Sequence, residues 1–150
     1  MSIDHVRFCA DKYLKNSYGF RAAASRPDLA KEANRLFATA GVSDAGTVLG
    51  VQTVAEDSDA IAFVVGENGL FLADTSKYVP YASIARPQAD YQDKQDFRAI
   101  DLELDDGSRV RLNVESGHGK LRDAFAVSSF LGHLLRRLKQ SHPAYQATPS

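Results

Sequence analysis

Cysteine and long hydrophobic runs are scarce in this chain. The single Cys9 cannot form an internal disulfide, which fits a reducing compartment and also fits a secreted protein that needs no bridge. No stretch approaches ~18 uncharged apolar residues, and Asp4, Arg7 and Asp11 interrupt the N-terminal segment. We therefore expect a cytoplasmic protein with no signal peptide and no integral membrane association.

An excess of charge of one sign is also missing. Eighteen basic residues stand against 19 acidic ones, so the formal net charge is -1 and nothing supports the phosphate neutralisation that nucleic-acid binding needs. We expect no nucleic-acid partner. The 150 residues are 44% hydrophobic and 25% charged, as in ordinary globular proteins. That length suits one domain over residues 1–150.

Two helices are predicted within residues 1–45, because apolar residues recur there at steps of three and four. The first follows a cap at Ser2, and its apolar stripe runs from Ile3 to Leu14. The second has Ser25 as its cap, Pro27 in its first turn and Gly41 after its last turn. Its predicted buried face holds Leu29, Ala33, Leu36, Phe37 and Ala40. The two helices have room to pack as a hairpin or to lie separately on a later sheet.

From Thr47 the apolar period changes towards two, which predicts short strands in the segments TVLGVQTV, AIAFVV, LFLAD and YVPYASI. The Asn68-Gly69 pair predicts a type I′ hairpin turn, because both central residues of that turn need positive φ. Pro80 has no backbone donor and predicts an edge position or a bulge. The polar stretch 87–96 is the clearest predicted long loop.

The charged residues of the last hairpin predict its register. A three-residue loop of Asp105, Asp106 and a left-handed Gly107 sets Glu103 opposite Arg109, with apolar residues paired on the other face. A wide apolar stripe then predicts a helix over 120–139, followed by a flexible tail over 140–150.

These elements define an α+β fold class. Two N-terminal helices lie beside a curved antiparallel sheet or split barrel of about six to seven strands, which the C-terminal helix closes. The segments AFVVGENGLFLAD, YVPYASI and IDLELDDGSRVRLNV resemble a bacterial pleckstrin-homology-like (PH-like) domain over residues 47–139. The chain has six clear strands where that family has seven, and it lacks the tryptophan often found in the last helix. The resemblance implies a scaffold that binds lipids or proteins.

Three candidate sites each have a competing structural interpretation. His118 in SGHGK precedes the last helix, where glycines and helix N–H groups can receive a phosphate or serve simply as a cap. The acidic face of Asp101 and Glu103 has basic residues opposite it, which favours an ion-pair ladder over a metal site. A triad of Cys9, His5 or His118 and an aspartate is opposed by the place of Cys9 on an apolar helix stripe.

We expect no catalytic residues, no cofactor and no metal, and we expect a non-enzymatic module that binds a protein partner. One concrete form is an immunity-type inhibitor that blocks a toxin. A basic partner would meet an acidic, aromatic surface made of Asp90, Tyr91, Asp93, Asp96, Asp105 and Asp106.

The alternative function is binding of a lipid or small ligand by the PH-like scaffold. The mostly acidic turns disfavour an anionic lipid. The last helix nevertheless ends in a basic cluster that favours the helix dipole and would also meet an acidic protein or an anionic head group. This cluster contains His133, Arg136, Arg137 and Lys139.

Overall fold

The computed structural model describes residues 3–17, 19–43, 45–54, 57–88, 99–113 and 120–141. Within them lie three α-helices, α1 (Ile3–Tyr13), α2 (Pro27–Thr39) and α3 (Lys120–Ser141), and two 3-10 turns at Leu14–Asn16 and Tyr81–Ser83. The eight strands are β1 (Phe20–Ala22), β2 (Val48–Thr53), β3 (Ile61–Gly66), β4 (Gly69–Leu72), β5 (Lys77–Pro80), β6 (Ile84–Gln88), β7 (Ala99–Leu104) and β8 (Arg109–Asn113). The predicted α+β class is confirmed, with more strands than expected.

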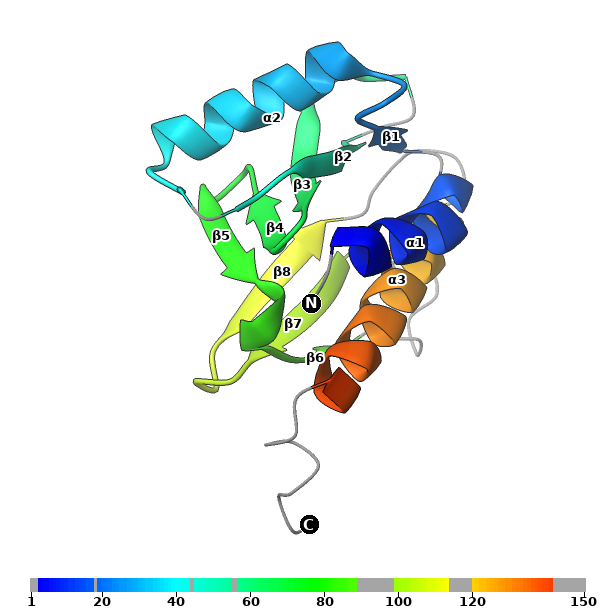
Figure 1. Cartoon of the computed structure of the whole chain (residues 1–150), viewed down its shortest axis with the longest axis vertical. Helices are drawn as coiled ribbons and strands as arrows, with labels where there is room; N and C mark the ends of the chain where they lie inside the picture. Colours follow the sequence, from blue (N-terminus) through cyan, green and yellow to red (C-terminus); the bar gives the residue numbers. More distant parts are fainter. Residues whose placement is uncertain are drawn as a thin grey trace, which may run out of the picture.

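The described strands form two antiparallel sheets that do not close into a barrel (Figure 1). The larger sheet has the order β1-β2-β3-β4-β5, and the smaller one has the order β6-β7-β8. The C-terminal helix α3 packs against β6 and β7 of the smaller sheet, and also against α1. Antiparallel strands followed by a C-terminal helix are therefore confirmed, whereas the single curved sheet that the sequence predicted is divided into two sheets.

The larger sheet is buried on both faces. On one face α2 supplies Leu29, Ala33 and Phe37, which pack with Val64 and Phe71. The opposite face shares a second core with α1, α3 and the smaller sheet, and Phe63, Val65, Leu70 and Leu72 point into it. Burial on both faces explains why the segments of β3 and β4 are continuously apolar rather than alternating.

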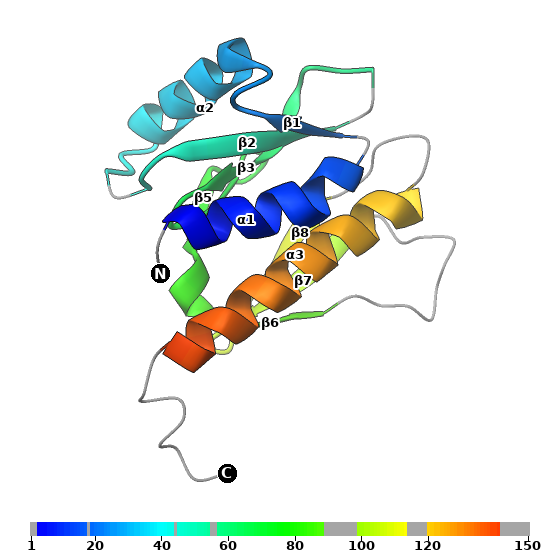
Figure 2. The same ribbon diagram turned by 45° about the vertical axis from the view of Figure 1, so that its right-hand side comes forward.

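The two N-terminal helices do not form a hairpin. Helix α1 lies along α3, and α2 covers the far side of the larger sheet (Figure 2). The predicted stripe of α1 is buried at Val6, Cys9, Ala10 and Leu14. These residues meet Phe130, Leu131 and other apolar residues of α3 in the same core.

The register of the last hairpin is confirmed in full. Glu103 lies opposite Arg109, and Asp101 lies opposite Arg111, with an ion pair of 3.2 Å between the Arg111 Nε and an Asp101 carboxylate oxygen. Gly107 has φ of 86°, the left-handed conformation that a three-residue loop needs there.

The predicted start of the second helix was wrong. Arg26, not Ser25, occupies the cap position of α2, and its side chain makes no capping hydrogen bond. Pro27 does lie in the first turn, and Gly41 follows the helix with positive φ. Ala40 is exposed, so it does not belong to the buried face.

Three predictions about strands and turns were also wrong. Asn68 and Gly69 do not have positive φ, so their turn is not type I′. The segment YVPYASI is not one strand: the 3-10 turn at Tyr81–Ser83 divides β5 from β6. The short strand β1 lies between the two predicted helices, where no strand was predicted. Pro80 does lie at a sheet edge, because β5 is the last strand of the larger sheet.

Candidate functional site

The clearest candidate site is a hollow of about 250 Å³ between α1 and the C-terminal half of α3. We call it the α1–α3 groove. On α1 the other lining residues lie three, four, seven and eight positions after His5, a spacing that puts them all on one helix face. The groove is lined by His5, Phe8, Cys9, Lys12, Tyr13, His133, Arg136 and Arg137.

The groove is basic and aromatic. Lys12, Arg136 and Arg137 are its basic residues, and none of the eight described lining residues is acidic. The Lys12 ammonium lies 5.9 Å from the centre of the Phe8 ring and 5.5 Å from that of Tyr13. Tyr13 stacks on His133 with ring centres 4.6 Å apart and an angle of 17° between the planes. This stack fixes one wall of the groove.

His5 and Cys9 lie one helical turn apart at the groove, with 3.8 Å between the His5 Nε2 and the Cys9 Sγ. Burial, and secondly the positive charge of Arg137, lowers the pKa of His5. Burial raises the pKa of the Cys9 thiol, against the opposing effect of Arg137 and Lys12. At neutral pH the pair is therefore a neutral imidazole beside a neutral thiol. That state does not suit a nucleophile, which has to be a thiolate.

We expect the Arg137→Gln substitution to raise the pKa of His5. The substitution removes a positive charge that disfavours the imidazolium, while the burial of His5 remains. An NMR titration of the imidazole resonances measures the shift. Arg35→Gln, on α2, is the control and should leave the pKa of His5 unchanged. An unchanged pKa in Arg137→Gln would show that Arg137 does not act on His5.

The acidic surface expected from the sequence is only partly visible. Asp90, Tyr91, Asp93 and Asp96 lie outside the described residues, as does His118. Asp105 and Asp106 are exposed in the turn between β7 and β8. Hydrogen bonds from the hydroxyl and the backbone N–H of Ser108 lower the pKa of Asp106. Asp106 therefore shapes the turn, and the structure does not bring it together with the α1–α3 groove.

Two tyrosines of the segment YVPYASI belong mainly to the core. Tyr81 is buried, and its hydroxyl donates a hydrogen bond of 2.7 Å to the Gly66 carbonyl. Tyr78 is half-buried against Phe37, with ring centres 6.1 Å apart. Phe97 and the tail residues from 142 onward lie outside the described residues. The tail was predicted to begin too early, because α3 continues to Ser141.

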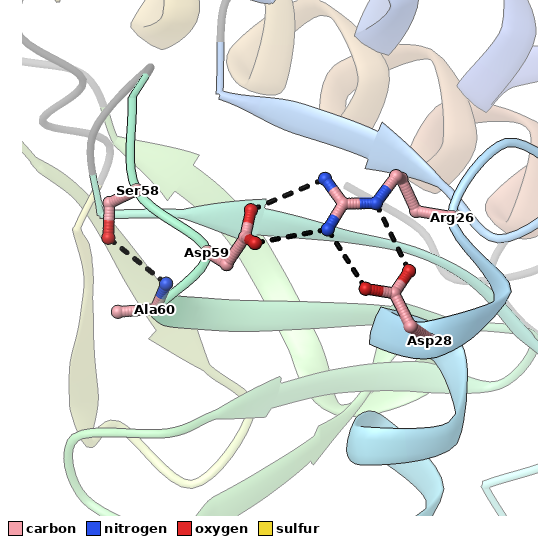
Figure 3. A network of polar contacts seen from close by, with 5 residues as sticks. All are labelled: Arg26, Asp28, Ser58, Asp59 and Ala60. Atoms are coloured by element: carbon pink, nitrogen blue, oxygen red, sulfur yellow. Dashed lines mark hydrogen bonds and ion pairs between the residues drawn. The ribbon is translucent and has the colours of Figure 1, made fainter.

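A polar network joins the start of α2 to the segment before β3 (Figure 3). Arg26 donates to both carboxylate oxygens of Asp28, at 3.1 and 2.9 Å, and to both of Asp59, at 3.3 and 3.1 Å. The guanidinium lowers the pKa of Asp28. Because both carboxylates are already paired, we assign this network to the local structure and not to ligand binding. Among the described residues, no group of three metal-ligating side chains gathers anywhere.

A second hollow of about 550 Å³ lies between α1 and the strands β1 and β2. Its walls are largely apolar, with three consecutive alanines, and the charged groups among its lining residues are Arg7 and Asp11 of α1. The hollow is lined by Arg7, Ala10, Asp11, Phe20, Ala22, Ala23, Ala24, Thr47, Val48 and Leu49.

The basic residues of α3 were anticipated from the sequence, whereas the α1 half of the groove was not. His5, Phe8 and Lys12 share a helix face next to the buried stripe. Their spacing in the sequence could therefore have indicated the α1 half of the groove. What the sequence could not provide was the packing of α1 along α3, which joins the two halves.

No family model, no curated protein and no solved structure matches this chain. Within the described residues, none of the helices has the length and apolar character that a membrane crossing requires.

Proposed function

We propose that this protein is a non-enzymatic binding module that docks an acidic segment of a partner protein into the α1–α3 groove. The observation that carries the proposal is the charge of the groove: Lys12, Arg136 and Arg137 line one hollow that has no acidic side chain among its described lining residues. Arginine and aromatic residues are the types enriched in protein interfaces. A partner's carboxylates would complement the positive charge of these three residues.

The resemblance to a PH-like domain over residues 47–139 implies a scaffold that binds lipids or proteins, but the α1 half of the groove lies outside those residues. An immunity-type inhibitor of a toxin remains one concrete form that such a module takes. The groove favours an acidic partner, whereas the surface of Asp105 and Asp106 would suit a basic one. We prefer the groove because its charges converge on a hollow, while the two aspartates lie in an exposed turn.

Charge reversal in the groove tests the proposal. We expect the double variant Lys12→Glu/Arg136→Glu to bind a fluorescein-labelled, glutamate-rich peptide about tenfold more weakly than the unchanged protein, because two attractions become repulsions. Fluorescence anisotropy at low and high salt measures the affinity. Binding to the unchanged protein should itself weaken as salt rises, since exposed charges are screened.

The matched control is Lys31→Glu/Arg35→Glu, which changes the net charge equally but alters α2 on the far side of the larger sheet. Both double variants should keep the melting temperature of the unchanged protein within a few degrees. If the two double variants weaken binding equally, the peptide responds to net charge and the groove is not its site. If neither weakens it, the proposed docking of an acidic segment is wrong.

The second hollow favours another function, binding of a small apolar ligand. Its volume of about 550 Å³ falls within the range of about 300–1,000 Å³ typical of small-molecule sites. Saturable binding of a fluorescent fatty acid, abolished by Ala23→Phe but not by Lys12→Glu/Arg136→Glu, would favour this function. Equal binding to Ala23→Phe would exclude the hollow as the site.

A further inference from the structure

We propose that the α1–α3 groove receives one aromatic side chain of the acidic partner segment, seated against Phe8 and flanked by Arg136 and Arg137. The inference rests on the proposed function and specifies it. The recognised segment would combine an aromatic anchor with neighbouring carboxylates, so that acidity alone would not suffice for full affinity.

The size of the groove favours a single side chain. Its volume of about 250 Å³ lies below the range of about 300–1,000 Å³ in which sites for whole small molecules fall. A protein segment that crosses the groove can place one large side chain in such a space while its backbone stays outside. Binding energy in protein interfaces is commonly concentrated in a few such anchors.

Phe8 supplies the surface on which an anchor would pack. It is 59% exposed, and Val54 is the one other large hydrophobic residue with such exposure in the described part of the chain. The apolar stripe of α1 does not include Phe8, since Val6, Cys9, Ala10 and Leu14 are the residues that the core covers. Leaving a phenylalanine in water at the edge of a hollow has a cost that a bound apolar group would remove.

The chemistry of the walls favours an aromatic anchor over an aliphatic one. Aromatic rings pair edge to face with one another, and Phe8, Tyr13 and His133 all line the groove. Guanidinium groups also stack on aromatic faces, which Arg136 and Arg137 would do with an inserted ring. An aliphatic side chain would gain only the removal of its apolar surface from water.

The basic residues of the groove determine which groups of the partner would lie beside the anchor. Arg136, Arg137 and Lys12 line the same hollow, so carboxylates on either side of an inserted ring would lie within reach of a basic side chain. Arginine pairs with carboxylates through two parallel hydrogen bonds, which adds geometric selectivity to the attraction. A basic segment would be repelled.

The experiment compares three fluorescein-labelled decapeptides by anisotropy. The first is glutamate-rich with one central phenylalanine, the second has alanine in place of the phenylalanine, and the third keeps the phenylalanine but has glutamine in place of each glutamate. The proteins are the unchanged chain, Phe8→Ala and Phe8→Leu. Because Phe8 is exposed, these substitutions should leave the fold intact, which the melting temperature verifies.

We expect the unchanged protein to bind the phenylalanine peptide about tenfold more tightly than the alanine peptide, a difference of about 1.4 kcal/mol. In Phe8→Ala that preference should fall below about threefold, and Phe8→Leu should lie between the two. The glutamine peptide should bind weakly to all three proteins. This pattern would support an aromatic anchor in an acidic segment.

Equal binding of the phenylalanine and alanine peptides to the unchanged protein would overturn the anchor. The proposed function would still stand in that case if Lys12→Glu/Arg136→Glu weakened both peptides. Failure of all peptides to bind would overturn both proposals together. Binding to phosphatidylserine vesicles that depends on Phe8, without any preference among the peptides, would replace the anchor with a lipid surface.

Discussion

Replacement of Phe130 by alanine is expected to lower the free energy of unfolding by about 3–5 kcal/mol, the largest effect that we expect from any single substitution in this chain. Phe130 is 1% exposed and lies in the core that joins α1, α3 and both sheets. Its ring meets that of Tyr81 edge to face, with centres 6.3 Å apart. Alanine would leave a cavity where these elements converge.

Urea denaturation followed by circular dichroism measures this loss. Phe8→Ala removes the same side chain from an exposed position and is the matched control, with an expected change within about 0.5 kcal/mol. A loss below about 1 kcal/mol in Phe130→Ala would contradict the packing of α3 against the core. A loss of similar size in Phe8→Ala would mean that Phe8 is buried in solution.

Gly69→Ala and Gly132→Ala are expected to change stability in opposite directions. A β-carbon on Gly69 would lie 2.5 Å from the Val79 carbonyl oxygen and 2.8 Å from the Pro80 Cα, and both of these atoms belong to the backbone of β5. The strand would have to shift, at a cost of about 1–3 kcal/mol. Gly132 lies inside α3 with open space around its Cα, so alanine should stabilise the protein by about 0.5–1 kcal/mol.

The same denaturation experiment compares the two variants, and each serves as the control for the other. A stabilising Gly69→Ala would mean that β4 and β5 are farther apart than the structure shows. A destabilising Gly132→Ala would mean that another group occupies the space beside α3. Because both substitutions reduce the freedom of the unfolded chain alike, the difference between them reports on the folded state.

Where local chemistry was decisive, the sequence was sufficient to predict the structure. The register of β7 and β8 followed from opposite charges on one face, apolar pairs on the other and a left-handed Gly107. The buried stripe of α1 and the start of α3 at Lys120 followed from spacing at three and four residues, whereas α3 ends two residues later than predicted.

The failures occurred where a distant strand was decisive. The Asn68-Gly69 pair correctly predicted a tight hairpin between β3 and β4, but Gly69 itself begins β4. Its structural reason is the close approach of β5, which lies eight residues and more along the chain. Strand β1 has only three residues, too few for an alternating pattern, and it forms because β2 provides a partner. Arg26 replaces Ser25 at the start of α2, and there its guanidinium pairs with Asp59 from a distant segment.

The candidate site, too, could be predicted from the sequence only in part. The basic residues at the end of α3 could be identified in advance, because they lie on the polar side of a strongly amphipathic pattern. The groove itself depends on how α1 packs along α3, which no local signal specifies. The predicted acidic surface combined a loop at residues 90–96 with the turn at Asp105 and Asp106, and the structure describes only that turn.

The order of the larger sheet has a consequence for solubility. Its most apolar strands, β3 and β4, are segments that would template aggregation if their edges were open, since they combine high β propensity with few charges. The topology places β3 at the centre, with β4 beside it. The two outer strands are poor templates, because β1 has three residues and β5 ends in Pro80, which cannot donate a backbone hydrogen bond. The sheet is thereby protected against adding strands from other copies of the chain.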